Sequence, residues 1–267
     1  MKGEKVSKRL RETIQENIKN NKKMLSLYLT AGFPDLELTE KIILACDSAK
    51  VDFIELGMPF SDPIADGPTI QKAADRALQQ GVNLRRIFQL VERVRKQSDI
   101  PVILMGYLNP VFQFGFEHFF EECARVKIDG LILPDWPVEE SEPYQPLLNS
   151  LDLDLIYLIA PNTPKARIKK IDAISRAFVY CTAYTGVTGK DNRPLPGTEQ
   201  FLKELKTKLQ NPFLIGFGIK SRQDVEFYSQ YAAGVIIGSA FIKFLENSDE
   251  SKIVQNIKRF VQELRGY

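Results

Sequence analysis

The sequence has few of the residues that usually carry metal or nucleophilic chemistry. Among 267 residues there are only three cysteines and one histidine. The cysteines (Cys46, Cys123 and Cys181) are far apart and odd in number, so they match neither a zinc spacing nor a disulfide framework, and they fit a reducing compartment. His118 stands in a helical pattern away from any strand end. This argues against a zinc site and against a Cys–His or Ser–His–Asp nucleophile. None of the expected strands contains a lysine that could form a Schiff base.

The chain also lacks an excess of charge and a long apolar run. Its 36 basic and 34 acidic residues leave a net charge of +2, which provides no overall field for attracting nucleic acid or an anionic membrane. The first lysines alternate with glutamates, as they do on a solvated helix face. No apolar run approaches membrane-spanning length, and the N-terminus is charged where a signal peptide is apolar. We expect a cytoplasmic protein with no nucleic-acid or membrane partner and no metal.

What the sequence does contain is a regular alternation of apolar runs and amphipathic stretches. Apolar strands separated by helices are typical of a parallel sheet that is buried on both faces. The expected strands are Leu25–Thr30, Phe53–Gly57, Val102–Gly106, Gly130–Leu133, Asp154–Ala160, Phe178–Ala183, Phe213–Gly216 and Val235–Ile237. The expected helices include Leu38–Ala49, Leu84–Lys96, Glu117–Val126, Ala166–Ser175, Glu199–Leu209 and Arg222–Tyr231. About eight such units predict an α/β fold, a (β/α)₈ TIM barrel formed by residues 1–267 as a single domain.

An open, doubly wound sheet is the main alternative for this alternation. Against it, residues 29–34 after the first strand lack the G-x-G-x-x-G pattern of dinucleotide-binding folds.

Two segments exceed a minimal barrel. Val6, Leu10, Ile14 and Ile18 recur at every fourth residue, which predicts an additional N-terminal helix that closes the N-terminal end of the barrel. Asp62–Gln80 leaves room for an extra loop and helix after the second strand. Extra length after a strand lies at the C-terminal face, where barrel enzymes build their active sites.

Glu55 is the candidate catalytic residue that stands out most clearly. It lies near the end of an apolar strand, where an unpaired charge facing a packed interior costs several kcal/mol. Burial raises the pKa of a carboxyl group, and a raised pKa suits a group that donates and accepts a proton near neutral pH. The following loop, stiffened by prolines, offers Asp62 and Asp66 as a second carboxylate, and spacing alone does not choose between them.

Glycines near the C-terminus indicate a phosphate site. Gly216–Ile219 follows the seventh expected strand and Gly238–Ala240 the eighth, the two loops in which many barrels bind phosphate through backbone N–H groups. Ser239 can begin a helix and also donate a hydrogen bond. A steric role for glycine at these turns is the alternative. The segment 185–197, after the sixth strand, is long, polar and glycine-rich. This composition fits an active-site lid and a plain flexible connection equally well.

These residues together resemble the tryptophan synthase α subunit family. The segment ELGMPFSDPIADGPTIQ (residues 55–71) is similar to the family signature. Further matches are YLTAG (28–32), MGYLNP (105–110), LPD (133–135), PVEE (137–140), GVTG (186–189), GFGI (216–219) and GSA (238–240). The resemblance covers nearly the whole chain. The chain departs from the pattern at Ala183 and Tyr184, before GVTG, and at Trp136, where an aliphatic residue is more usual.

The resemblance implies a lyase that cleaves indole-3-glycerol phosphate into indole and glyceraldehyde 3-phosphate during tryptophan biosynthesis. It assigns acid–base catalysis to Glu55 and binding of the indole N–H to Asp66. The residues that it implies for substrate binding are Tyr28, Tyr107, Ile132, Pro134, Tyr180 and Thr188. The residues that it implies for phosphate binding are Gly189, Gly218, Gly238 and Ser239.

The resemblance further implies an α₂β₂ heterotetramer in which the β subunit carries pyridoxal phosphate and this chain needs no cofactor. A stand-alone indole-3-glycerol phosphate lyase and a catalytically silent regulatory α subunit are the two alternatives. The presence of both Glu55 and Asp66 argues against the silent subunit.

Overall fold

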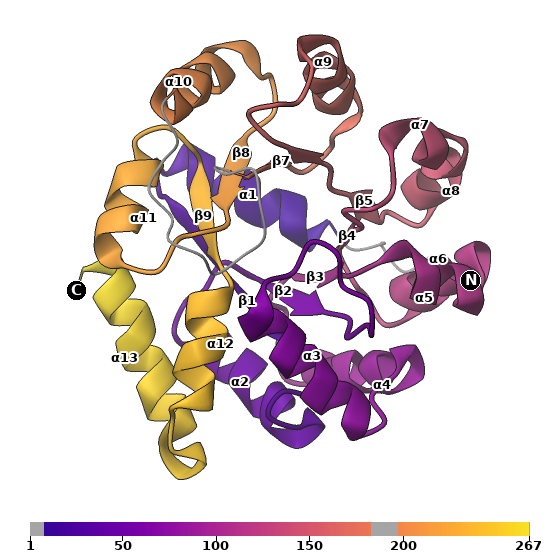
Figure 1. Ribbon diagram of the computed structural model, residues 1–267, viewed down its shortest axis with the longest axis vertical. Helices are drawn as coiled ribbons and strands as arrows, with labels where there is room; N and C mark the ends of the chain where they lie inside the picture. The colour runs from indigo at the N-terminus through magenta and orange to yellow at the C-terminus, as the bar shows by residue number, and fades with distance from the viewer. Residues whose placement is uncertain (1–7, 183–196, 267) are drawn as a thin grey trace.

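The computed structural model describes residues 8–182 and 197–266, and their strands form one curled parallel sheet. Its strand order is β5-β4-β3-β2-β1-β9-β8-β7-β6. The strands are β1 (Met24–Thr30), β2 (Phe53–Gly57), β3 (Val102–Met105), β4 (Gly130–Ile132), β5 (Asp154–Leu155), β6 (Leu158–Ile159), β7 (Val179–Thr182), β8 (Phe213–Gly216) and β9 (Gly234–Ile237). Figure 1 shows these strands in the middle of the molecule with the helices around them. The predicted TIM barrel is confirmed.

The expected strand Asp154–Ala160 is wrong as one continuous element. It is divided into β5, which pairs with β4, and β6, which pairs with β7. Between them, the Ile156 N–H donates to Leu131 O at 2.9 Å and Tyr157 O accepts from the Tyr180 N–H at 3.0 Å. The chain therefore changes its pairing partner within two residues. The two halves together fill one barrel position, and the barrel closes there.

Helices cover the outside of the barrel. They are α2 (Leu36–Ser48), α3 (Pro68–Gln79), α4 (Leu84–Arg95), α5 (Leu108–Phe114), α6 (Phe116–Arg125), α7 (Val138–Ser141), α8 (Gln145–Ser150), α9 (Lys165–Ile174), α10 (Thr198–Lys208), α11 (Arg222–Ser229), α12 (Ser239–Glu246) and α13 (Ile253–Arg265), with 3₁₀ turns at Glu142–Tyr144 and Glu250–Lys252. Polar side chains begin several of them: Asp35 and Asn83 accept from backbone N–H groups, and Ser221 forms a capping box with Asp224. Among the described residues, no helix is both long enough and apolar enough to cross a membrane.

The additional N-terminal helix α1 (Arg9–Lys19) closes one end of the barrel as predicted. Leu10 and Ile14 are buried in the cluster of apolar side chains that fills the barrel interior, with Phe53, Phe178 and others. Figure 1 shows α1 lying across the middle of the ring of helices. The inclusion of Ile18 in this buried stripe is wrong: its side chain is 49% exposed, because the helix turns Asn17 toward the protein in its place. Val6 lies outside the described residues.

Helix α3 is the extra helix predicted after the second strand. Gly67 precedes it and Pro68 is its first residue, a position where proline fits because its missing N–H has no partner there in any helix. Helix α5 was not expected from the sequence. It has only seven residues, contains Pro110, and is followed by Gly115 with φ +89°. A helix this short has no long apolar periodicity from which it could be predicted.

Candidate active site

Glu55 lies in the barrel interior on β2. Its neighbours in the sheet are Tyr28 on β1 and Ile103 on β3. The side chain is 0% exposed, and neither carboxylate oxygen has a hydrogen-bond partner among the described residues. Burial raises the pKa of Glu55 to about 8, because the charged form loses its hydration without gaining a partner. At neutral pH this carboxyl group is therefore mostly protonated and has a proton to give.

Asp66 is the second carboxylate of the site. It lies in the loop between β2 and α3, and it lines the same cavity as Glu55. Burial raises the pKa of Asp66 to about 6, and a hydrogen bond from Tyr107 opposes that rise. Asp62, the alternative left open by spacing, is exposed and accepts a hydrogen bond from the Ser61 hydroxyl at 2.5 Å. The cavity therefore contains Asp66 and not Asp62.

The two carboxyl groups thus share one cavity with pKa values on either side of neutrality. Near pH 7, Glu55 is mainly the neutral acid and Asp66 is mainly the anion. A pair of titratable groups whose surroundings separate their pKa values is the usual arrangement for one acid and one anionic group in the same reaction.

Two tyrosines complete the inner wall of this cavity. Tyr28 and Tyr180 are buried, and burial raises the pKa of both hydroxyl groups, so both stay neutral. Glycines on the adjacent strands leave space for their rings. A Cβ at Gly57 would lie 2.2 Å from the Tyr28 hydroxyl, and one at Gly216 would lie 1.9 Å from the Tyr180 hydroxyl. The two tyrosine rings can therefore occupy these positions only because the neighbouring strands have glycine beside them.

Gly216→Ala is expected to displace Tyr180 and to lower the free energy of unfolding by about 1–3 kcal/mol, the usual cost of overpacking a core. Turnover should fall with it, because Tyr180 lines the cavity. Chemical denaturation together with a crystal structure of the variant tests this. A variant of unchanged stability with Tyr180 in place would show that the ring is not held by the absence of a side chain at Gly216.

The loops after β8 and β9 close the cavity on another side. Phe217 and Gly218 both adopt positive φ, +75° and +79°, so the chain turns sharply where Gly218 faces the cavity. Gly238 precedes α12 and Ser239 begins it. The first N–H groups of a helix lack acceptors within the helix, and its positive end favours anions. The geometry suits a phosphate group here.

The structure brings together most of the residues named from the sequence. Tyr28, Glu55, Asp66, Tyr180, Gly218, Gly238 and Ser239 all line one cavity. Ile132 is buried in the barrel interior and Pro134 is half-buried, and neither is among the lining residues. Tyr107 is not a lining residue either, but its hydroxyl contacts the loop that carries Asp66. Thr188, Gly189, Ala183 and Tyr184 lie outside the described residues.

Sequence reasoning missed several apolar residues that also line the cavity. These are Ile70, Met105, Phe217, Ile219 and Ile236. Ile236 could have been found, because it alternates with outward-facing neighbours on an expected strand. Ile70 gave no signal, since it belongs to the extra helix α3 and its position depends on how the preceding loop turns.

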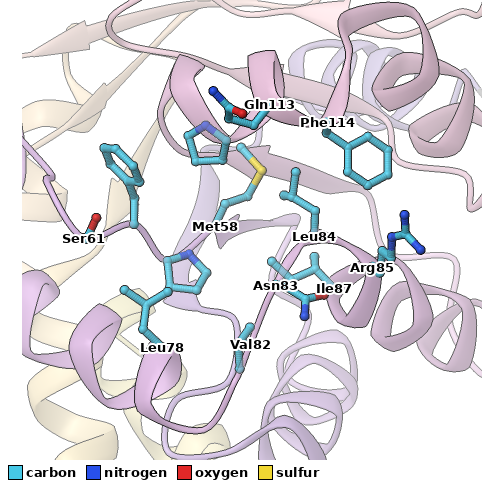
Figure 2. A pocket seen from close by; sticks show the side chains of 13 residues that line it. Met58, Ser61, Leu78, Val82, Asn83, Leu84, Arg85, Ile87, Gln113 and Phe114 are labelled. Atoms are coloured by element: carbon cyan, nitrogen blue, oxygen red, sulfur yellow. The ribbon is translucent and has the colours of Figure 1, made fainter.

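A larger groove of about 450 Å³ opens beside the cavity, between the loop after β2 and helices α3, α4 and α5. Figure 2 shows Met58, Leu78 and Leu84 among the side chains around it, with Arg85 at its edge. Among the described residues that line the groove there is no carboxylate. Two large exposed apolar residues come from the segments that form it: Ile64, which is 77% exposed, and Phe112, which is 63% exposed.

Known proteins share both the sequence and this architecture. The family described as "Tryptophan synthase alpha chain" matches residues 14–266. The chain belongs to the tryptophan synthase alpha chain family. The tryptophan synthase alpha chain of Christiangramia forsetii is 42% identical over 248 residues, which cover 92% of this chain and 97% of that protein. That of Prochlorococcus marinus is 40% identical and covers 98% of this chain and 94% of that protein. The crystal structure of tryptophan synthase subunit alpha from Legionella pneumophila superimposes with a TM-score of 0.87 at 34% identity, covering 97% of both chains.

Membership of the tryptophan synthase alpha chain family confirms the resemblance carried by residues 55–71. That segment provides both carboxylates of the cavity, one from the strand and one from the loop that follows it. The segment most specific to the family therefore contains the two cavity carboxyl groups whose pKa values are raised by burial.

Proposed function

We propose that this tryptophan synthase alpha chain cleaves indole-3-glycerol phosphate into indole and glyceraldehyde 3-phosphate, with Glu55 and Asp66 as the catalytic residues. The observation that carries the proposal is the Glu55 carboxyl group: it is fully buried, has no partner among the described residues, and shares its cavity with Asp66. A carboxyl group held in that state is stabilised once a substrate group pairs with it.

The reaction follows from the two protonation states. Neutral Glu55 donates its proton to C3 of the indole ring, and the positive charge that forms on the ring at the N–H is stabilised by the Asp66 carboxylate. Glu55, now ionised, takes the proton of the glycerol hydroxyl next to the ring. The carbon–carbon bond to the ring then breaks, its electron pair returns to the indole, and an aldehyde leaves. The proton that Glu55 gave is replaced, and the site is ready again.

The remaining cavity residues suit the other parts of this substrate. Tyr28 and Tyr180 offer flat, neutral surfaces beside the carboxylates, and Gly218, Gly238 and Ser239 provide the backbone N–H groups and hydroxyl for the phosphate. We assign Ile132, Pro134, Thr188 and Gly189 to the same site from the family pattern. The chemistry needs no metal and no organic cofactor in this chain, and pyridoxal phosphate would belong to the β chain.

Release of glyceraldehyde 3-phosphate from indole-3-glycerol phosphate, measured with and without a tryptophan synthase β chain, tests the proposal. We expect slow release by the chain alone and much faster release with the β chain. Fast release without the β chain would identify a stand-alone lyase. No release under either condition would identify a silent regulatory subunit and overturn the catalytic assignment.

We further propose that the β chain docks over the groove of Figure 2. The exposed Ile64 and Phe112 belong to two of the segments that form the groove, the loop after β2 and helix α5, and large exposed apolar side chains are a feature of protein interfaces. This surface is built on the loop that also carries Asp66, so a partner bound here contacts the catalytic loop from outside.

Phe112→Asp is expected to weaken binding of the β chain by about tenfold or more, because it places a charge in an apolar contact. Turnover by the chain alone should not change. Titration of turnover against β-chain concentration measures both quantities. Val254→Asp is the matched control, since Val254 is 52% exposed on α13, away from the groove. Equal stimulation of both variants would place the β-chain interface elsewhere.

A further inference from the structure

Tyr107 lies where two loops of the barrel meet. It stands between β3 and α5 and is 4% exposed. Its hydroxyl oxygen accepts a hydrogen bond from the Ala65 N–H at 3.0 Å, and the hydroxyl donates a hydrogen bond to the Asp66 carboxylate. The ring packs against Phe60 with centroids 5.5 Å apart. One side chain thus contacts the loop after β2 at three residues, Phe60, Ala65 and Asp66, although it does not line the cavity.

Tyr107 is itself held by the next loop of the barrel. The N–H of Leu108, the residue after it, donates to both carboxylate oxygens of Asp135, at 3.0 Å each. Asp135 follows β4, and the next residue, Trp136, is buried with its ring stacked on Phe116 at 5.3 Å. A negative side chain at the N-terminus of α5 is favourable because it accepts an otherwise unpaired N–H group.

These contacts form a chain from the loop after β4, through the loop after β3, to the carboxylate after β2. We propose that Tyr107 is a positioning residue whose hydroxyl holds the Asp66 carboxylate toward the cavity, and that Asp135 holds Tyr107 in place for this. The inference rests on the proposed function, because it concerns the group that would stabilise the indole N–H. It gives Tyr107 a role toward Asp66 that differs from contact with the indole ring.

In the part of the chain that the structure describes, the other titratable groups near Asp66 do not obscure its titration. Tyr28, Tyr180 and Tyr107 stay neutral because burial raises the pKa of each hydroxyl well above neutral pH. Glu55 ionises only near pH 8. Below that pH, the main polar influence on Asp66 from the described residues is the hydrogen bond from Tyr107, which lowers its pKa against the effect of burial. Loss of the hydroxyl therefore moves the Asp66 pKa upward.

Tyr107→Phe is the variant that tests this, because it keeps the ring and its packing on Phe60 and removes only the hydroxyl. We expect the pKa of Asp66 to rise by about one unit, the scale of a lost hydrogen bond to a carboxylate. The acid limb of the kcat/KM profile should move up by the same amount, so turnover falls several-fold at pH 6.5 and recovers by pH 8. A purely structural role would lower turnover without moving the limb.

The pKa is measured directly by carbon NMR titration of the Asp66 carboxyl, assigned with Asp66→Asn, in the intact chain. Asp135→Ala should shift it in the same direction but less. The double variant should shift it no further than Tyr107→Phe alone, because both act on one contact. Tyr157→Phe is the matched control: Tyr157 is also buried, with its hydroxyl bonded to Ser141 at 2.7 Å, and should leave the Asp66 pKa unchanged.

The NMR titration also separates this inference from the proposed function. A shifted Asp66 pKa in a chain that cleaves no indole-3-glycerol phosphate would support the positioning role and overturn the reaction. An unshifted pKa in Tyr107→Phe, with full turnover by the wild type, would overturn the positioning role and leave the reaction standing.

Discussion

Replacing Glu55 with glutamine is expected to lower turnover of indole-3-glycerol phosphate by roughly 10²–10⁴-fold, the usual contribution of a general acid and base. Glutamine has nearly the same shape and can still accept a hydrogen bond, but it cannot donate a proton to the indole ring or take one from the glycerol hydroxyl. Substrate binding should therefore survive. Steady-state kinetics together with calorimetric titration of the substrate measures the two effects separately.

The same substitution is expected to stabilise the fold at alkaline pH. The pKa of Glu55 is raised to about 8 in the folded chain from 4.5, so the folded state binds more protons than the unfolded state between these values. The contribution of Glu55 to the free energy of unfolding of the wild type is therefore fully present below pH 4.5 and is lost as the pH rises toward 8. Glutamine carries no such cost. Its advantage should reach a few kcal/mol at pH 9, because each unit of pKa shift is worth about 1.4 kcal/mol.

Urea denaturation of both proteins at pH 5 and pH 9 checks this expectation. Glu117→Gln is the control, since Glu117 is exposed on α6 and its substitution should change neither turnover nor the pH dependence. A difference in stability that does not grow with pH would mean that the Glu55 carboxyl is paired or hydrated. Unchanged turnover in Glu55→Gln would remove it from the reaction altogether.

Much of the fold could be predicted from the sequence because barrel strands buried on both faces are short, unbroken apolar runs. Phe53–Gly57 and Phe213–Gly216 are identical in prediction and structure. The divided strand β5–β6 could not be read in this way, because residues 155–160 form an unbroken apolar run while the break depends on which neighbour each backbone group meets. Helix α5 was missed for a similar reason: its seven residues are held by Asp135, which is 27 positions away in sequence.

Prediction of the site worked where a residue broke a local rule. Glu55 is recognisable because a charge stands inside an apolar strand. Asp66 was separated from Asp62 only by the family resemblance, since both precede turn-forming residues and the difference lies in how the loop folds back. The role of Tyr107 toward Asp66 could not be predicted from the sequence. A tyrosine among apolar residues gives the same pattern whether its ring contacts a ligand or its hydroxyl holds a loop.

Replacing Asp66 with asparagine is expected to lower turnover by roughly 10²–10³-fold, the usual loss when one group that stabilises developing charge is removed. The asparagine carbonyl can still accept a hydrogen bond from the indole N–H, so ground-state binding changes little. It carries no negative charge, however, and cannot offset the positive charge that forms when C3 is protonated. The loss should appear mainly in kcat, measured by steady-state kinetics at pH 7.5.

The pH dependence makes this expectation specific to Asp66. Wild-type kcat/KM should fall as the pH drops through about 6, where the Asp66 carboxylate takes up a proton, and the residual activity of Asp66→Asn should lack that limb. Asp62→Asn is the matched control, because Asp62 is an exposed carboxylate in the same loop and its removal should leave both the rate of the isolated chain and the limb unchanged. If Asp62→Asn lost the limb and Asp66→Asn kept it, the two carboxylates would have to exchange roles. The loop would then have to turn over when substrate binds, because Asp66 is the one that faces the cavity now.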